Sequence, residues 1–156
     1  MVKVLFVCLG NICRSPTADA VFRKMVDDAG LDDRITVDSA GTGSWHIGHA
    51  PDRRATAAAL LRGYDLTPLR ARQVTVDDFH LFDHILAMDE SNMTDLQLLC
   101  PHHHREKLRL FLEFAPELNE TEVPDPYYGG DDGFDRVLDM VEAAAGGLLQ
   151  QLRRSI

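Results

Sequence analysis

The stretch Val7-Cys8-Leu9-Gly10-Asn11-Ile12-Cys13-Arg14-Ser15-Pro16 joins an apolar run to the predicted start of a helix. Apart from Lys3, residues 2–7 are apolar, with Val and Phe, and this composition predicts a buried strand. Pro16 suits the first turn of a helix, because the N–H that proline lacks is not needed there. A loop between a strand and a helix can turn its backbone N–H groups inward, and the helix adds the positive end of its dipole. The stretch therefore predicts a phosphate-binding loop with a cysteine at its base.

Each residue type of this loop suits the chemistry of a phosphate ester. The inward N–H groups, the helix start and Arg14 all favour the reactive thiolate form of Cys8. The planar guanidinium of Arg14 can grip two phosphoryl oxygens at once. Gly10 and Asn11 tolerate positive φ angles, which a tight loop demands, and Ser15 can donate its hydroxyl to the sulfur. The alternative is that Cys8 is a buried structural cysteine, because free cysteine is often buried. We predict Cys8 and Arg14 as catalytic residues, and the phosphate-binding loop as Leu9, Gly10, Asn11, Ile12, Cys13 and Ser15.

The composition of the whole chain predicts one globular domain over residues 1–156, because 45% of the residues are hydrophobic and 26% are charged. The net charge of −9 argues against nucleic acid and against an anionic membrane as partners, since neither would meet a basic surface. The apolar runs are too short for a signal peptide or a membrane span. These features predict a cytoplasmic protein.

The three cysteines, an odd number, fit a reducing compartment better than a framework of disulfides. Cys13 lies in the same loop as Cys8, and two interpretations of it stay open. The two thiols can pair under oxidation, which would shield the reactive sulfur from over-oxidation, or Cys13 only fills space behind the loop. Cys100, which precedes a proline, is expected to be a core residue at the end of a helix.

The order of apolar and polar segments predicts an α/β fold. Strands alternate with helices, so the crossovers should be right-handed and should give a four-stranded parallel sheet with helices on both faces. Ser91 or Asn92 is expected to cap the helix that ends near Cys100, and Gly146-Gly147 should weaken the last helix. The strands are predicted at 2–7, 35–39, 84–88 and 107–111, and the helices at 18–29, 53–62, 92–100 and 134–152, with a helical turn at 77–79.

Ligands of parallel sheets bind beyond the carboxyl ends of the strands, where Cys8, Ser39 and Asp89 are all expected. A second source of chemistry is the segment Val123-Pro124-Asp125-Pro126-Tyr127-Tyr128-Gly129-Gly130. Its two prolines stiffen the chain around Asp125, which can protonate the alkoxide or phenolate that leaves when a thiolate attacks phosphorus. The neighbouring tyrosines can form an aromatic wall. Taken alone, the segment could equally be an ordinary surface turn.

Together, five motifs of this chain resemble those of the low molecular weight protein tyrosine phosphatases, in the same order and over essentially the entire sequence. They are Cys8-Leu9-Gly10-Asn11-Ile12-Cys13-Arg14-Ser15-Pro16, Asp38-Ser39-Ala40-Gly41-Thr42, Ala71-Arg72-Gln73, Met88-Asp89-Glu90-Ser91-Asn92 and Asp125-Pro126-Tyr127-Tyr128-Gly129.

The resemblance implies a flavodoxin-like, three-layer α/β/α fold and a two-step hydrolysis that uses no metal and no cofactor. Cys8 would become a phosphocysteine, Arg14 and the loop would hold the phosphoryl oxygens, and Asp125 would act first as acid and then as base. The expected substrates are phosphotyrosine-containing proteins or small aryl phosphates, and the protein is expected to be a monomer or to self-associate weakly. Further residues implied by the family are Asn11, Ser15 and Ser39 as supports of the loop, and Trp45, Tyr127 and Tyr128 as the walls of a slot for the substrate ring.

Two positions bear on how closely the chain follows the family. Leu69 stands where the family commonly has a histidine that is thought to support the loop serine, which implies that Ser15 lacks its usual partner. Ile12 stands where arginine phosphatases of the same fold have threonine, which favours phosphotyrosine moderately.

Two other functions compete with the phosphatase. A thioredoxin-coupled arsenate reductase shares this loop but needs two further cysteines, and only Cys100 is left over. A non-catalytic phosphate-binding module on the same fold would need neither the thiol nor Asp125. The run Cys100-Pro101-His102-His103-His104 could suggest a metal site, but three consecutive histidines cannot all face one ion, so a solvated loop is expected there. His46 and His49 are expected at the rim of the pocket, as exposed side chains.

Overall fold

The centre of the fold is a parallel sheet with the strand order β2-β1-β3-β4, seen here in a computed structural model that describes residues 1–127, 129–130 and 132–156. All three pairs of neighbouring strands are parallel. The strands are β1 (Val2–Cys8), β2 (Ile35–Gly41), β3 (His84–Ala87) and β4 (Leu108–Leu110). The helices are α1 (Arg14–Asp28), α2 (Arg53–Leu61), α3 (Asp78–Leu81), α4 (Glu90–Leu99) and α5 (Asp132–Arg153), and the 3₁₀ helices are η1 (His102–Lys107), η2 (Phe111–Phe114) and η3 (Pro116–Leu118).

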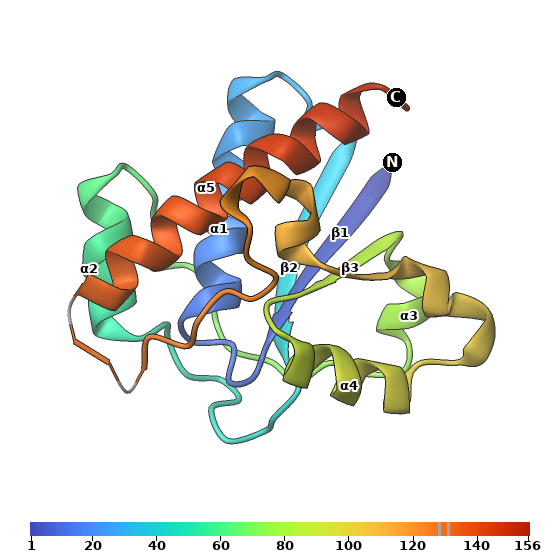
Figure 1. The fold of residues 1–156 in the computed structure, drawn as a ribbon, viewed down its shortest axis with the longest axis horizontal. Helices are drawn as coiled ribbons and strands as arrows, with labels where there is room; N and C mark the ends of the chain where they lie inside the picture. The colour runs from blue at the N-terminus through green and yellow to red at the C-terminus, as the bar shows by residue number, and fades with distance from the viewer. Residues whose placement is uncertain (128, 131) are drawn as a thin grey trace.

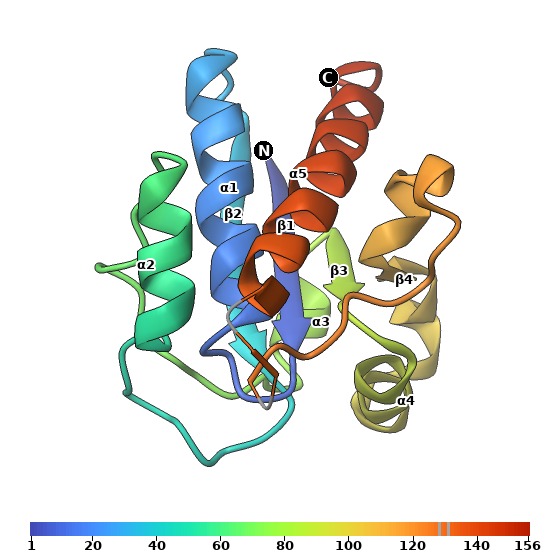
Figure 2. The ribbon, with the colours of Figure 1, turned by 60° about the vertical axis from the view of Figure 1, so that its left-hand side comes forward.

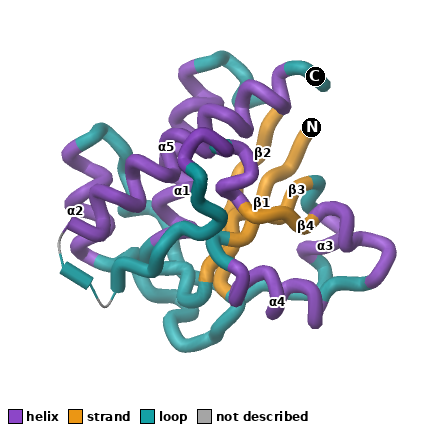
Figure 3. The backbone as a smooth tube through the Cα atoms, in the orientation of Figure 1, coloured by secondary structure: helices purple, strands orange, loops and turns teal. Residues whose placement is uncertain are grey.

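Helices cover both faces of the sheet, as predicted. Side chains of a strand alternate between its two faces, so Val4 and Phe6 of β1 join a larger hydrophobic cluster with α1, α2 and α5. Leu5 and Val7 point the other way and join a smaller cluster with α3 and α4. Figures 1 and 3 show the strands between these two groups of helices. The three-layer α/β/α arrangement is therefore confirmed.

The carboxyl ends of the three longer strands meet at one edge of the sheet. Cys8 at the end of β1 pairs with Gly41 of β2, and Val7 pairs with Ala87 at the end of β3. The loop that follows Cys8 leads directly into α1, which packs against α5 (Figure 2). The predicted phosphate-binding loop therefore lies at the edge where ligands of parallel sheets bind.

Several boundaries differ from the prediction. The first helix begins at Arg14, just ahead of the start predicted at Ser15-Pro16 and four residues ahead of the predicted range 18–29, so the arginine belongs to the first helical turn. The predicted caps Ser91 and Asn92 of α4 are wrong: Asp89 is the N-cap, and its side chain accepts a hydrogen bond from the Asn92 N–H. The histidine run 102–104, predicted as a solvated loop, is part of the 3₁₀ helix η1, which also takes in Lys107 from the predicted strand 107–111.

The glycine pair in the last helix has a packing reason at one of its two positions. Gly147 of α5 approaches η2 so closely that a Cβ there would overlap the carbonyl oxygen of Phe114, whereas Gly146 faces open space. A side chain at position 147 would push α5 away from η2. Close packing therefore requires glycine here, although glycine has a lower helix propensity than most other residues.

None of the helices in the described part of the chain is both long enough and apolar enough to cross a lipid bilayer.

Candidate active site

Cys8 lies at the base of a loop that turns backbone and side-chain donors toward its sulfur. The residue is 2% exposed, at the point where β1 ends. Its Sγ accepts the N–H of Asn11 at 3.3 Å and lies 3.0 Å from the Oγ of Ser15. Both donors would stabilise negative charge on the sulfur. Within the described residues, the loop amides of Gly10, Ile12 and Cys13 donate no hydrogen bond to the protein, so they can receive an anion.

Asn11 holds the shape of the loop. Its φ of 57° lies in the left-handed region, as predicted for this position, and its side chain is buried. The Nδ2 group donates to the Oγ of Ser15 at 2.6 Å and to the Oγ of Ser39 at 3.0 Å. The Oδ1 atom accepts the backbone N–H of Arg72 at 3.0 Å. One buried amide thus links the loop to β2 and to the segment before α3.

Gly10 serves a different purpose from the one predicted, because a positive φ is not found there. A Cβ at Gly10 would lie 3.0 Å from the ring of His46, so the missing side chain leaves room for this imidazole. The prediction for Gly10 was wrong because close packing, and not backbone conformation, restricts this position.

Arg14 is buried and fixed from one side. Its Nη1 donates to the Oδ2 of Asp89 at 2.6 Å and to the backbone oxygen of Val123 at 3.0 Å. Burial alone would lower the pKa of Arg14, but the charge of Cys8 and the hydrogen bond and charge of Asp89 raise it above its ordinary value. The guanidinium therefore keeps its charge, and its other nitrogens can bind an anion.

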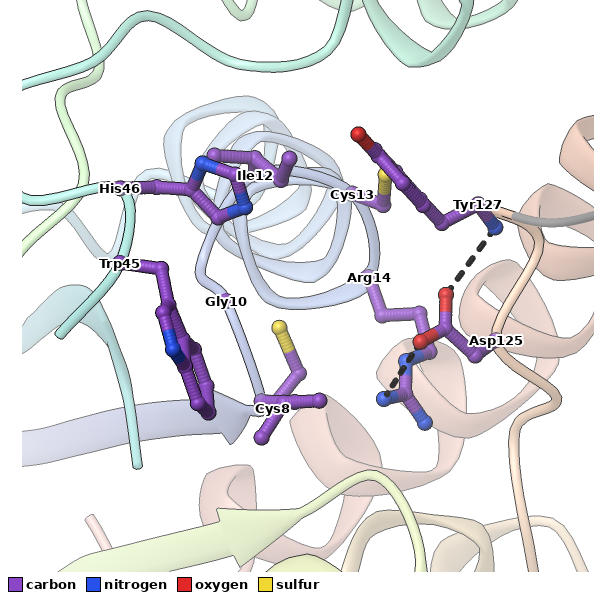
Figure 4. A pocket seen from close by; sticks show the side chains of 10 residues that line it. Cys8, Gly10, Ile12, Cys13, Arg14, Trp45, His46, Asp125 and Tyr127 are labelled. Atoms are coloured by element: carbon purple, nitrogen blue, oxygen red, sulfur yellow. Dashed lines mark hydrogen bonds and ion pairs between the residues drawn. The ribbon is translucent and has the colours of Figure 1, made fainter. Parts of the chain in front are cut away.

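Asp125 reaches the same place from a separate loop. Its Oδ1 accepts the N–H of Tyr127 at 3.0 Å, and its Oδ2 lies 3.7 Å from the Nη2 of Arg14. Figure 4 shows the carboxylate beside the guanidinium, on the side of the pocket that faces Cys8. The loop conformation therefore aims the acid at the same space as the sulfur.

Aromatic side chains line the mouth of the pocket. Trp45 stands along one side, with 68% of its surface exposed, and His46 and Tyr127 lie opposite one another with ring centroids 6.5 Å apart (Figure 4). A Cβ at Gly43 would overlap the indole of Trp45, so this glycine sets the position of the ring. Tyr128, predicted as a further wall, lies outside the described residues. The pocket has a volume of about 380 Å³ and is lined by Cys8, Leu9, Gly10, Ile12, Cys13, Arg14, Trp45, His46, Asp125 and Tyr127.

The other two cysteines differ in their relation to this pocket. Cys13 lines it as a free thiol, and burial, with Asp52 and Cys8 acting in the same direction, raises its pKa far above the ordinary value. Cys13 therefore stays protonated. Cys100 is a buried residue at the end of α4, as predicted, and belongs to the hydrophobic cluster on the opposite face of the sheet from Cys8.

Two residues that position the site were not predicted as site residues. Asp89 anchors Arg14, and Arg72 fixes Asn11 through its backbone while its guanidinium pairs with Asp38 at 3.1 Å and Asp78 at 3.0 Å. Asp89 was expected at the ligand-binding edge from its place after a strand, but its contact with Arg14 was not predicted. The contacts of Arg72 bridge segments far apart in the sequence, and no local pattern predicts them.

Leu69 does not leave Ser15 without a partner. The Ser15 hydroxyl contacts the sulfur of Cys8, accepts from Asn11, and lies 3.4 Å from the carbonyl oxygen of Ala40. Leu69 is half-buried and packs against the larger hydrophobic cluster. Ser15 thus lacks the histidine partner of the family, as implied, and Asn11, Cys8 and Ala40 hold its hydroxyl instead.

Comparisons with known proteins agree with this geometry. A family model described as low molecular weight phosphotyrosine protein phosphatase matches residues 3–156. The low molecular weight protein-tyrosine-phosphatase of Streptomyces coelicolor is 45% identical over 157 residues, which cover 99% of this chain and 95% of that protein. A protein tyrosine phosphatase from Entamoeba histolytica, solved with Hepes in its active site, superposes with a TM-score of 0.96 at 42% identity and 99% coverage of both chains.

An arginine phosphatase from Drosophila has the same fold at a greater distance, with a TM-score of 0.87, 32% identity, and coverage of 97% of this chain and 98% of that one. The match of the family model over almost the whole length, together with relatives above 40% identity, settles the family. This chain belongs to the low molecular weight phosphotyrosine protein phosphatases.

Proposed function

We propose that this protein hydrolyses phosphotyrosine and small aryl phosphates through a phosphocysteine intermediate on Cys8. The observation that carries the proposal is that Cys8 and Arg14, at the two ends of one loop, and Asp125, from a separate segment, line one pocket. A thiol, a fixed cation and an acid around one space are the groups that transfer of a phosphoryl group to sulfur requires.

In the first step, the thiolate of Cys8 attacks phosphorus, and the bond between phosphorus and the aryl oxygen breaks. Asp125 gives its proton to the departing phenolate, so that the product leaves as a neutral phenol. Arg14 and the loop N–H groups hold the other three oxygens of the phosphoryl group. The phosphate binds the Nη2 of Arg14, which lies near the carboxylate of Asp125 when no substrate is bound.

In the second step, water attacks the phosphocysteine, and the bond between phosphorus and sulfur breaks. Asp125, now a carboxylate, takes a proton from the water, and inorganic phosphate leaves. The N–H of Asn11 and the hydroxyl of Ser15 stabilise the returning thiolate, because both lie within hydrogen-bond distance of the sulfur.

The shape of the pocket supports an aryl substrate. Trp45 and Tyr127 offer flat apolar surfaces on two sides, and Ile12 adds an aliphatic surface near the phosphate loop. An aromatic ring gains from contact with such walls. The guanidinium group of a phosphoarginine substrate would gain less, because the described pocket offers it few hydrogen-bond acceptors apart from Asp125. Phosphotyrosine is therefore preferred over phosphoarginine, the substrate class of the Drosophila relative.

The position of Cys100 counts against the reductase alternative. A disulfide relay would require a second thiol able to approach Cys8, and Cys100 lies on the other side of the sheet. Burial also raises the pKa of Cys100, which opposes formation of a thiolate.

The test is turnover of p-nitrophenyl phosphate by the wild-type protein, by Cys8→Ser, and by Cys100→Ala as a control that removes a buried thiol elsewhere. We expect turnover by the wild type and the control and none by Cys8→Ser. A phosphate trapped during turnover should be found on the peptide that contains Cys8 by mass spectrometry. A protein that only binds phosphate would show no turnover in any form, and hydrolysis that survives Cys8→Ser would exclude the phosphocysteine route.

We further propose that the chain acts as a monomer or a weakly self-associating protein on phosphotyrosine-containing proteins. The pocket is built within a single chain, so catalysis needs no second copy. Sedimentation velocity over a range of concentrations measures the association directly.

A further inference from the structure

Three histidine side chains converge on a surface far from the pocket. His80 lies in α3, and His103 and His104 lie in η1. One ring nitrogen from each lies within 4.8 Å of the other two, and the described residues contain no other group of three potential ligands this close. The Nε2 of His104 lies 2.9 Å from the Nδ1 of His80, and the ring centroids of His103 and His104 are 4.2 Å apart.

The fold holds the two segments together independently of these rings. Lys107, the last residue of η1, donates from its Nζ to the backbone oxygen of Phe79 at 2.8 Å, next to His80. Arg105 donates to the backbone oxygen of Gln97 at 3.2 Å, which fixes η1 against α4. The cluster is therefore built on anchored backbone and does not depend on one flexible loop.

Two of the three consecutive histidines take part in the cluster. A 3₁₀ helix has three residues per turn, so the three side chains leave the helix in different directions, and the rings of His103 and His104 turn toward one another, with their centroids 4.2 Å apart. His103 and His104 face α3, and His102 lies outside the cluster. A run of three histidines alone therefore makes no site, and the third ligand comes from His80, a distant position in the sequence.

We propose that His80, His103 and His104 bind one divalent transition-metal ion of the Zn²⁺ class. Imidazole nitrogen suits Zn²⁺, Ni²⁺ and Cu²⁺, and three histidines with water in the fourth position form a common tetrahedral set. Two nitrogens bound tetrahedrally at about 2.0–2.1 Å from Zn²⁺ lie about 3.3 Å apart. The 2.9 Å and 4.8 Å separations here bracket that value, so small rotations of exposed rings complete the set.

The electrostatic surroundings of His104 act on its pKa in the direction that favours a neutral imidazole. Burial, the charge of Lys107, and the neighbouring His103 and His80 lower the pKa of His104, while Glu106 acts in the opposite direction. A neutral imidazole offers its lone pair to the ion. To bind the ion with both facing nitrogens, the imidazole that donates the hydrogen bond between His104 and His80 must carry its proton on its other ring nitrogen, so that each facing nitrogen offers a lone pair.

The ion would act as a structural clamp and would take no part in hydrolysis. The segments α3 and η1 lead into β3 and β4, so the cluster lies toward the amino ends of these parallel strands. Cys8 lies at the carboxyl end of β1, at the opposite edge of the sheet. The metal would join α3 to η1 and stabilise the folded chain by binding it in preference to the unfolded chain.

The test is a titration of ZnCl₂ into the protein by calorimetry, in a Cys8→Ser background that removes the thiol at the base of the pocket as a competing soft ligand. The variants are His80→Asn, His103→Asn and His104→Asn, and the matched control is His102→Asn, which removes a histidine of the same run. Thermal unfolding with and without ZnCl₂ gives a second measurement. All four positions are in or beside surface segments, and unfolding without metal checks that each variant folds.

We expect about one Zn²⁺ per chain, a rise in unfolding temperature with ZnCl₂, loss of both in the three cluster variants, and retention of both in His102→Asn. Two results would overturn the proposal. One is the absence of binding in the Cys8→Ser protein. The other is binding that survives His80→Asn or that His102→Asn weakens as much as His103→Asn, because the run alone would then chelate the ion.

Discussion

Asp89 holds Arg14 with one carboxylate oxygen and caps α4 with the other. Its Oδ2 accepts from the Nη1 of Arg14 at 2.6 Å, and its Oδ1 accepts from the backbone N–H of Asn92 at 2.7 Å. The start of α4 therefore fixes the orientation of a guanidinium that belongs to α1. Because Nη1 is occupied, the remaining donors of Arg14 are turned toward the pocket.

The first prediction is that Asp89→Asn lowers kcat/KM for p-nitrophenyl phosphate about 10- to 100-fold, since a small misplacement of a group that binds the transition state is costly. The amide of asparagine caps helices as well as aspartate does, so α4 can still form. It cannot, however, accept from Arg14 and Asn92 with two oxygens. The measurement is steady-state kinetics together with circular dichroism.

The control for Asp89→Asn is Glu90→Gln, which removes a carboxylate at the next position of the same helix. Glu90 is exposed and does not line the pocket, so its replacement should leave kcat/KM within about twofold of the wild type. Equal losses in the two variants would show that net charge, and not the contact with Arg14, is what matters.

The second prediction concerns the acid. Asp125→Asn should slow hydrolysis of phenyl phosphate by about 10²- to 10⁴-fold, because phenolate leaves poorly without a proton. The loss for p-nitrophenyl phosphate should be far smaller, because p-nitrophenolate leaves readily by itself. Asp135→Asn, which changes an exposed carboxylate of α5 outside the pocket, is the control. Equal losses for the two substrates would remove Asp125 from the role of acid.

The third prediction concerns the wall of the pocket. Gly43→Ala places a Cβ where the indole of Trp45 now lies, so the ring must move. We expect KM for a phosphotyrosine peptide to rise about two- to tenfold, the range of an aromatic contact. Competitive inhibition by inorganic phosphate should not change, because phosphate contacts the loop and Arg14 and not the ring of Trp45. Ser44→Ala in the same segment is the control. If the inhibition constant of phosphate rose in Gly43→Ala as much as KM for the peptide, Trp45 would not act as a wall for the substrate ring.

The contiguous part of the site could be predicted from the sequence. Residues 8–15 lie on one strand–loop–helix unit, so their types and order alone indicate an anion site with a nucleophile. The strands were also placed within one or two residues, because each contains a short run rich in apolar residues. Asp125 was also predicted, from the residues around it in the segment 123–130. Its approach to Arg14, however, depends on the path of the chain after β4.

The remaining contacts depend on tertiary structure. Asp89 meets Arg14, Arg72 meets Asn11, and His80 meets the histidines of η1 only after the sheet has assembled. A sequence pattern records which residues are near along the chain, and these pairs are distant along it. The same reason explains Gly147, whose lack of a side chain is needed only because the backbone of Phe114 packs there.

The fourth prediction uses the two adjacent glycines of α5 as a matched pair. Gly146→Ala should stabilise the protein by about 1 kcal/mol, because alanine favours a helix and the added methyl group meets open space. Gly147→Ala should destabilise it by about 1–3 kcal/mol, because the methyl group overlaps the Phe114 carbonyl and forces α5 from η2. Urea unfolding at neutral pH measures both, and effects of the same sign would contradict the contact.

The last prediction is a dependence of stability on pH that arises from His84, the first residue of β3. Burial lowers the pKa of His84, with Asp83 opposing and Arg109 adding to the effect. The unfolded chain, in which histidine titrates near its ordinary value of about 6.5, therefore binds a proton more readily than the folded chain does. Below that pH, the unfolded state holds more protons, so the free energy of unfolding should fall as the pH falls from 7 to 5.

Glutamine at position 84 keeps a polar side chain of similar size but cannot take up a proton. The loss of unfolding free energy between pH 7 and pH 5 should therefore be smaller for His84→Gln than for the wild type. Carboxylates and the other histidines contribute alike to both proteins, so they cancel in the comparison. Urea unfolding at pH 7, 6 and 5 gives the two slopes, and equal slopes would show that His84 takes up its proton as easily in the folded chain as in the unfolded one.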